Sequence, residues 1–251
     1  MLKFLKEMRK KSHGDIHCRL DYLEKQIDAL GEHINILMKM TCKPEDELTV
    51  LCDIYGSDKG SLRFNKRKHT YTQLYYKLFS GIRNNVKSVF ECGIGTNNPN
   101  LPSTMGIDGK PGASLRVWRD YFKNAIIIGA DIDKNILFQE ERIYTGFMDQ
   151  LSPEAIKNFF QSLSPEYPNQ FDIMIDDGLH TLEAGVCFFE NAFQYLGEEG
   201  FYVIEDVESQ YIREFENYFK SCKNHDKITV HYEVMANKTV TDNNLIIIRK
   251  Q

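Results

Sequence analysis

The stretch FDIMIDDGLH, residues 171–180, decides how the chain folds. Its apolar run at 173–175 ends abruptly in Asp176 and Asp177, and His180 follows shortly after. A short apolar run of this kind predicts a strand that is buried on both faces of a parallel sheet. In open α/β sheets, ligands bind at the carboxyl ends of such strands. The stretch therefore predicts an α/β fold with a polar site at the end of this strand.

A second apolar run, GFYVI at 200–204, ends in the same way with Glu205 and Asp206. Two buried strands would thus bring up to four carboxylates and the imidazole of His180 to one edge of the sheet. Carboxylates gathered in this way repel one another unless a cation or a specific partner offsets their charge. The arrangement favours chemistry over a purely structural role, although a helix cap remains an alternative for His180.

The composition limits the classes of protein to consider. A chain of 251 residues with 42% hydrophobic residues suits one large α/β domain with an appendage. The formal net charge of -5 argues against a general nucleic-acid binder. The six cysteines form no C-x-x-C pair, which indicates a reducing, cytoplasmic setting. No signal peptide and no membrane-spanning run is expected.

The N-terminal segment shows a heptad pattern at residues 16–37. The apolar positions that carry it are Ile16, Leu20, Leu23, Ile27, Leu30, Ile34 and Leu37. Mostly Ile at one position and Leu at the other favours a parallel two-stranded coiled coil, and hence a homodimer. The alternative is a single amphipathic helix that packs on its own domain. We expect an N-terminal helix at 1–42, followed by one catalytic domain at 43–251.

The remaining pattern alternates strands and helices. Strands are expected to begin near residue 88 and to occupy 125–130 and 142–148, before the two runs described above. The last two, at 228–235 and 245–248, are separated by about ten residues, so an antiparallel hairpin is expected. The predicted fold is Rossmann-like, with a seven-stranded, mostly parallel sheet that ends in this hairpin.

A glycine turn follows the first of these strands, in the pattern Glu91-x-Gly93-x-Gly95. Glycines at such a turn let the backbone approach a ligand closely. Two cofactor classes compete, a dinucleotide and S-adenosylmethionine. The dinucleotide fingerprint needs a third glycine where Asn98 stands, and an acid about twenty residues on, whereas Asp131 lies much further away.

At this point the sequence resembles the class I S-adenosylmethionine-dependent methyltransferases. The resemblance implies that Glu91, Gly93 and Gly95 form the cofactor turn. It also implies that Asp131, at the end of the second strand, binds the ribose and that Asp149, after the third, approaches the adenine. The resemblance covers about residues 50–251.

Four segments carry a closer likeness: YGSDKG at 55–60, HTYT at 69–72, DDGLH at 176–180 and IEDV at 204–207. They resemble the macrolide sugar O-methyltransferases of the mycinamicin and macrocin type, and methyltransferases of surface-polysaccharide clusters. That likeness implies that Asp177, Glu205 and Asp206 bind a divalent cation, with Mg²⁺ expected. It also implies catalytic roles for His180, as the general base, and for Asp177.

The loop before the first strand is expected to fold over the cofactor. Its polar density beside two glycines, together with the family likeness, assigns Asp58, Lys59, His69 and Tyr71 to that loop. Asp176 is also assigned to the cofactor.

The sequence thus predicts an S-adenosylmethionine-dependent O-methyltransferase that acts on a sugar hydroxyl or sugar-linked group in capsular or surface polysaccharide biosynthesis. A cation would activate the hydroxyl, and a neutral histidine would take its proton. One alternative is a metal-independent methyltransferase for a phosphate or phosphoramidate oxygen of a capsule. Another is a non-catalytic coiled-coil interaction protein that keeps the fold.

Overall fold

The computed structural model describes residues 47–60, 69, 71–163, 165–235 and 242–251. The predicted N-terminal helix and its heptads at 16–37 lie outside these residues. Within the described part, no helix is long and apolar enough to cross a lipid bilayer.

One sheet organises the described residues, and its strands run in the order β3-β4-β2-β1-β5-β6-β8-β7. The strands are β1 (Ser88–Cys92), β2 (Ile126–Asp131), β3 (Gln139–Glu140), β4 (Ile143–Phe147), β5 (Phe171–Asp176), β6 (Leu196–Ile204), β7 (Ile228–Val234) and β8 (Asn244–Lys250). The pairings among β4, β2, β1, β5 and β6 are parallel, whereas β8 pairs antiparallel with both β6 and β7. The mostly parallel sheet and the terminal antiparallel hairpin are confirmed.

The predicted number of seven strands is wrong, because the described residues form eight. The added strand is β3, which pairs antiparallel with β4 at the edge of the sheet. Arg142 makes the reversal between these strands with a φ of +59°, in the left-handed region. A two-residue exposed strand carries no apolar alternation, so the sequence pattern could not reveal it.

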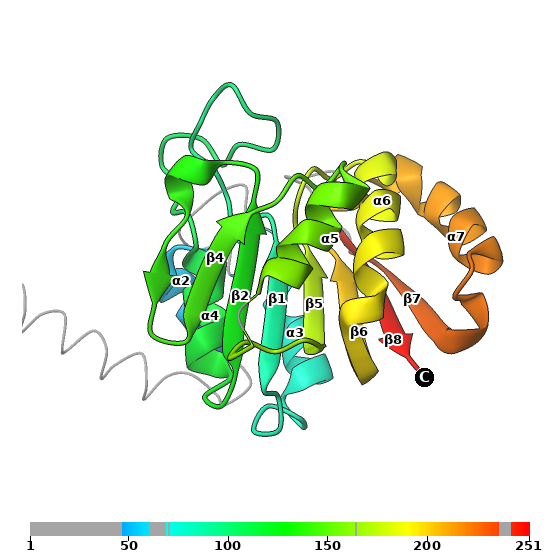
Figure 1. Ribbon diagram of the computed structural model, residues 1–251, viewed down its shortest axis with the longest axis horizontal. Coiled ribbons are helices and arrows are strands. Elements are labelled where there is room, and N and C mark those ends of the chain that lie inside the picture. Colours follow the sequence, from blue (N-terminus) through cyan, green and yellow to red (C-terminus); the bar gives the residue numbers. More distant parts are fainter. Residues whose placement is uncertain (1–46, 61–68, 70, 164, 236–241) are drawn as a thin grey trace, which may run out of the picture. The chain divides into compact units, whose positions relative to one another are not determined.

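Helices cover both faces of the sheet. They are α2 (Glu47–Tyr55), α3 (Thr72–Phe79), α4 (Ala113–Tyr121), α5 (Pro153–Ser162), α6 (Leu182–Ala192) and α7 (Ile212–Ser221). Short 3-10 helices occupy Lys134–Ile136, Phe193–Tyr195, Ser209–Tyr211 and His225–Lys227. Helices α5, α6 and α7 lie on one face, and α2, α3 and α4 lie on the other (Figure 1).

Local sequence explains where α5 and α6 begin. The hydroxyl of Ser152 accepts a hydrogen bond from the Ala155 amide at 3.2 Å, and Pro153 follows at the first helical position. Thr181 caps α6 in the same way, through a 3.3 Å bond from the Ala184 amide. The cap at Thr181 starts α6 directly after the acidic stretch and so places His180 at the end of the sheet.

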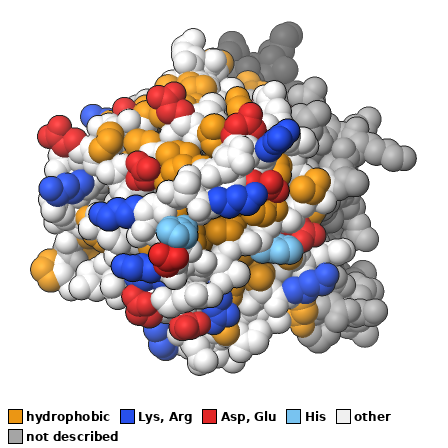
Figure 2. All heavy atoms as spheres, turned by 90° about the vertical axis from the view of Figure 1, so that its right-hand side faces the viewer, with side chains coloured by type: hydrophobic (Ala, Val, Ile, Leu, Met, Phe, Trp, Pro, Cys, Tyr) orange, Lys and Arg blue, Asp and Glu red, His pale blue; other side chains and the backbone are white. Residues whose placement is uncertain are grey.

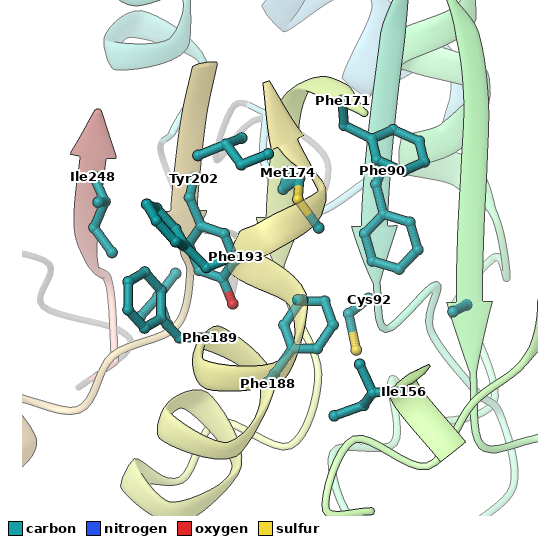
Figure 3. Packing of buried hydrophobic residues seen from close by; sticks show 14 of the residues in the cluster. Phe90, Cys92, Ile156, Phe171, Met174, Phe188, Phe189, Phe193, Tyr202 and Ile248 are labelled. Atoms are coloured by element: carbon teal, nitrogen blue, oxygen red, sulfur yellow. The ribbon is translucent and has the colours of Figure 1, made fainter. Parts of the chain in front are cut away.

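The two faces of the sheet pack different residues of the same strands. On the α6 side, Phe90 packs against Phe188 with ring centroids 5.8 Å apart, and Tyr202 meets Phe189 edge-on at 5.4 Å (Figure 3). On the α4 side, the core includes alternate strand residues such as Val89. This alternation decides toward which face each polar residue of a strand end points.

Charged side chains of both signs are interspersed with hydrophobic ones on the β7 side of the molecule (Figure 2). Among the described residues, Cys52, Cys92 and Cys222 are buried free thiols and Cys187 is half-buried.

Candidate functional site: two adjoining pockets at the carboxyl edge of the sheet

The first pocket lies at the carboxyl ends of β1, β2, β4 and β5 and holds about 720 Å³ of space, its open mouth included. It is lined by Cys92, Gly93, Gly95, Thr96, Pro102, Ser103, Asp131, Ile132, Met148, Asp149, Gln150, Leu151, Asp177, Gly178 and Leu179. Four residues predicted for the cofactor, Gly93, Gly95, Asp131 and Asp149, thus meet in one pocket.

The glycine turn is shaped by the backbone of the neighbouring strand end. Gly93 has a φ of +82°, and a Cβ at this position would lie 2.0 Å from the carbonyl oxygen of Asp177. The Gly93 amide donates to the carbonyl of Ala130, and the Asp177 amide donates to the carbonyl of Cys92, each at 2.8 Å. Only glycine fits here, because the ends of β1 and β5 approach each other too closely for a side chain.

Asp131 is fixed by backbone amides. Its Oδ2 accepts from the Ile94 amide at 2.9 Å, and its Oδ1 accepts from the Asp133 amide at 2.8 Å. Burial raises the pKa of Asp131, although these amides act in the opposite direction. Asp149 follows β4, and its Oδ1 accepts from the Leu151 amide at 3.0 Å. Both carboxylates border the pocket, and their roles toward ribose and adenine stay predictions.

The structure does not bring Glu91 and Asp176 to the first pocket, because strand alternation turns them away from it. Glu91 lies beneath the sheet on the α4 side, fully buried, where the Trp118 indole donates to it at 2.8 Å. Trp118 is therefore a core residue. Asp176 points to the α6 side and accepts from Gln150 Nε2 at 2.6 Å. Burial raises the pKa of each carboxyl to about 7.

Gln150 is a residue that the sequence reasoning missed. While its amide nitrogen holds Asp176, its Oε1 accepts from the Leu179 amide at 2.8 Å. A Cβ on Gly178 would lie 2.1 Å from this oxygen. Gln150 thus ties the turn after β5 to the end of β4. A neutral glutamine after an aspartate carries no sequence signal for such a role.

A second pocket adjoins the first and shares Gly95, Ser103 and Asp177 with it. It holds about 880 Å³ of space, its open mouth included. Its remaining lining residues are Gly56, Ser57, Asp58, Lys59, His69, Ile94, Thr104, Met105, Lys110, Ala113, Ser114, His180, Asp206 and Asp242. The loop residues Asp58, Lys59 and His69, which were predicted to fold over the cofactor, therefore line this neighbouring pocket.

Asp177, His180 and Asp206 come together at the wall of the second pocket, and one donor atom from each lies within 4.8 Å of the others. His180 Nε2 is 3.4 Å from Asp177 Oδ1 and 3.7 Å from Asp206 Oδ2. His180 and Asp206 both have left-handed backbones, with φ of +60° and +53°. Non-glycine residues rarely adopt this conformation, and strain of this kind gathers at functional sites.

The charges of this cluster shift its pKa values. Burial alone would lower the pKa of His180, but Asp206 and Asp177 outweigh it and raise the pKa to about 10. Burial likewise opposes the anionic form of Asp206, yet His180, His69 and Lys59 hold the pKa of Asp206 well below its ordinary value. The cluster is thus strongly coupled through charge.

Asp206 is held from the other side by the loop before β1. The Tyr71 hydroxyl donates to Asp206 Oδ1 at 2.6 Å, and His69 Nδ1 lies 2.9 Å from the same oxygen. Burial would lower the pKa of His69, but Asp206 overcomes it and raises the pKa to about 9. Tyr71 is buried and borders neither pocket, so the structure places it on Asp206 and away from the cofactor turn.

Glu205, predicted as a metal ligand, uses both carboxylate oxygens within the protein. Its Oε2 pairs with the ammonium of Lys59, and its Oε1 accepts from the hydroxyl of Tyr75. Tyr75 is fully buried in α3 and was not predicted as a site residue. The predicted ligands Asp177 and Asp206 lie in the cluster with His180. Glu205 is not part of that cluster and contacts Lys59 and Tyr75 instead.

The cluster fits a divalent cation. Two carboxylates face His180 Nε2, a buried nitrogen without a hydrogen bond inside the described part of the chain. Carboxylate oxygens are the ligands that Mg²⁺ and Mn²⁺ prefer, whereas an imidazole suits ions such as Zn²⁺ or Fe²⁺. Asp177 and Asp206 are therefore placed to hold a cation.

No family model matches the chain. Curated relatives include the 8-demethyl-8-alpha-L-rhamnosyl tetracenomycin-C 2'-O-methyltransferase of Streptomyces olivaceus, 32% identical over 62% of this chain and 36% of the relative. The demethylmacrocin O-methyltransferase of Streptomyces fradiae is 33% identical over 57% of this chain and 33% of the relative. The chain spans one third to two fifths of the length of the curated relatives it matches.

Among solved structures, the methyltransferase MycE of the mycinamycin pathway, in complex with Mg and SAH, superposes with a TM-score of 0.61 at 25% identity. The match covers 84% of this chain and 55% of MycE. Sheet order, glycine turn and sequence likeness together make the chain similar to the class I S-adenosylmethionine-dependent methyltransferases. Within that class it is similar to the macrolide sugar O-methyltransferases.

Proposed function

We propose that the chain is an S-adenosylmethionine-dependent O-methyltransferase that methylates a sugar hydroxyl or a sugar-linked group. The observation that supports this proposal most is that the two pockets share a wall formed by Gly95, Ser103 and Asp177. A methyl donor in the first pocket would face an acceptor in the second, beside Asp177 and His180. Curated relatives that act on antibiotic sugars support the same reaction class.

The transfer is an in-line displacement in which the acceptor oxygen forms a bond to the methyl carbon as the bond from that carbon to sulfur breaks. The sulfonium becomes a neutral thioether, and the hydroxyl proton leaves to a base. His180 borders the second pocket and would accept that proton. The two pockets would hold donor and acceptor in line with each other, and such positioning supplies much of the rate enhancement.

A bound divalent cation would lower the pKa of the acceptor hydroxyl and orient it. The residues that would hold it are Asp177 and Asp206. The carboxylates that raise the pKa of His180 to about 10 also keep it protonated at neutral pH. A cation held by these carboxylates would offset part of their charge and so lower the pKa of His180 toward the range of a working base.

The polar lining of the second pocket, with Asp58, His69, Thr104, Lys110 and Asp242, suits an acceptor rich in hydroxyl groups. We therefore propose a sugar of a capsular or surface polysaccharide, or its activated precursor, as the acceptor. Hydrogen-bonding side chains at such a wall select the orientation of one hydroxyl.

Radiolabelled methyl transfer tests the proposal. Purified enzyme is offered a panel of activated sugars and glycan fragments before and after exhaustive chelation, and again after Mg²⁺ is restored. We expect turnover that falls at least about 100-fold on chelation and returns with Mg²⁺. Binding of Mn²⁺, followed by electron paramagnetic resonance, should weaken in Asp206→Asn and stay unchanged in Asp226→Asn, an exposed aspartate in the short 3-10 helix before β7.

Full turnover in the chelated enzyme would instead support the metal-independent alternative. The ammonium of Lys59 among three carboxylates is the observation that favours that alternative, since it already offsets part of their charge. Failure to bind S-adenosylhomocysteine would leave the non-catalytic alternative.

A further inference from the structure

Lys59 is a buried ammonium surrounded by three carboxylates. Its residue exposure is 2%, and its Nζ lies 2.5 Å from Asp177 Oδ2 and 3.5 Å from Glu91 Oε1, with Glu205 Oε2 in direct contact. The loop that follows α2 delivers it, and the Tyr71 amide donates to the Lys59 carbonyl at 3.1 Å. These carboxylates come from the ends of three neighbouring strands, β1, β5 and β6.

Burying these charges requires close compensation. Removing an ammonium and several carboxylates from water costs more than a simple ion pair returns, and replacement by apolar residues is often neutral or stabilising. Lys59 is therefore poor evidence for stability by itself. An arrangement that is costly and also borders a pocket points to a role in shaping that pocket.

The cofactor is an unsuitable partner for Lys59. The residue borders the second pocket and is absent from the lining of the first. An ammonium placed beside a sulfonium would repel it, because both groups carry a positive charge. The three carboxylates instead account for the direction in which the side chain points.

Lys59 contacts one oxygen of each of two carboxylates. This contact fixes the direction in which the second oxygen of each carboxylate points. Asp177 turns Oδ2 to Lys59 and its Oδ1 to His180. Glu205 turns Oε2 to Lys59 and its Oε1 to Tyr75. The ammonium thus draws the ends of β5 and β6 together and sets which oxygen of Asp177 faces the second pocket.

We propose that Lys59 is a positioning residue of the methyl-transfer site, which holds Asp177 so that its Oδ1 faces His180 and the acceptor pocket. The role in turnover rests on the proposed function, whereas the orientation of Asp177 can be measured without turnover. Lys59 acts through Asp177 and Glu205 and does not touch the transferred methyl group.

Nitrogen-15 spectra of the histidine side chains test the orientation in the intact chain bound to S-adenosylhomocysteine. The His180 signal is identified by its loss in His180→Gln. In Lys59→Ala we expect this signal to move by several parts per million, in the direction also seen in Asp177→Asn. Methylammonium, which fits the space left by the side chain, should move it back, whereas methanol of similar size should not.

Turnover gives the second readout. Lys59→Ala should lower kcat about 10²-fold with the affinity for S-adenosylhomocysteine within about twofold, and methylammonium should restore part of kcat. Lys250→Ala is the matched control, because Lys250 pairs with Glu198 at 2.8 Å at the opposite end of the sheet. Its His180 signal and turnover should equal those of the unaltered chain.

Lys59→Met fills the space and removes the charge, so it should show the shifted His180 signal without a response to the amine. An unmoved His180 signal in folded Lys59→Ala and Lys59→Met would overturn the proposal. Loss of folding in both variants would overturn it too, since Lys59 would then determine the fold. An unaltered chain without any turnover would refute the proposed function, while the His180 signal would still decide the role of Lys59.

Discussion

The two pockets are built in different ways although they share a wall. In the first, backbone groups fix the cofactor turn: Gly93 and Gly95 have φ above +80°, and Asp131 is held by the amides of Ile94 and Asp133. The wall of the second pocket is made of side-chain charges that come from distant segments, as where Lys59 meets Asp177. Glycine turns of this kind leave a pattern in the local sequence, whereas the contacts of a charge cluster appear only in the folded chain.

The largest loss of cofactor binding and turnover is expected from a substitution at the contact between the glycine turn and the end of β5. Gly93→Val places a side chain where a Cβ alone would lie 2.0 Å from the Asp177 carbonyl oxygen. The β1 and β5 ends must then separate, which disrupts both pockets. We expect no measurable binding of S-adenosylhomocysteine in calorimetry and no turnover.

Gly81→Ala is the control for Gly93→Val, because a Cβ at Gly81 would meet nothing within 4 Å. It should bind as the unaltered chain does. Affinity of Gly93→Val within about threefold of the unaltered chain would contradict the close approach described here.

The next effect separates the second pocket from the first. His180→Gln should lower turnover by about 10²–10⁴, the usual contribution of a general base. Its affinity for S-adenosylhomocysteine should change by less than about twofold, because His180 borders the second pocket and not the first. The measurement is kcat beside calorimetric affinity.

His225→Gln serves as the control for His180→Gln, since His225 is half-exposed and follows α7. Equal losses of turnover and cofactor affinity in His180→Gln would remove the distinction between the pockets.

How much could be predicted follows from the same contrast. The glycine turn and Asp131 could be predicted because each directly follows a strand that the sequence pattern reveals, and both line the first pocket. Glu91 was misplaced because helices cover both faces of the sheet, so an all-buried strand shows no alternation to reveal which way a side chain points. Asp176 was misplaced for the same reason.

The tyrosine contacts of the acidic residues could not be predicted from the sequence. Tyr71 meets Asp206 across 135 residues of sequence, and Tyr75 meets Glu205 across 130. Nothing in the local pattern of either segment encodes such a meeting, because it depends on how α3 packs against the sheet. Clustering of Asp177, His180 and Asp206 was predictable, since parallel strands end at one edge.

A third prediction addresses the first pocket alone. Asp131→Asn keeps the size of the side chain but removes the charge that the resemblance assigns to the ribose hydroxyls. Hydrogen bonds to a charged group contribute about 1.5–3 kcal/mol. We therefore expect affinity for S-adenosylhomocysteine to fall by up to about 100-fold, with turnover at saturating cofactor reduced far less than in His180→Gln.

Asp120→Asn is the control for Asp131→Asn, because Asp120 contacts Tyr55 and Arg119 outside both pockets. Unchanged affinity in Asp131→Asn would take Asp131 out of the cofactor site.

The smallest effect concerns the residue that belongs to neither pocket. Burial raises the pKa of Glu91 to about 7, although Lys59 acts in the opposite direction. The folded protein therefore binds this proton more tightly than the unfolded chain does. The stability that follows is fully present below the ordinary carboxyl pKa and is lost as pH rises through about 7. Between about pH 5.5 and 8, Glu91 should lower the free energy of unfolding by about 2 kcal/mol.

Glu91→Gln keeps the acceptor for the Trp118 indole and cannot titrate, so its free energy of unfolding in urea should fall less steeply across that pH range. Glu140→Gln is a control of opposite sign: hydrogen bonds from Arg116 lower the pKa of Glu140, and its contribution is lost only as pH falls into the acid range. It should leave the slope between about pH 5.5 and 8 unchanged. A slope in Glu91→Gln equal to that of the unaltered chain would show that Glu91 stays charged beneath the sheet, with Lys59 as its full counter-ion.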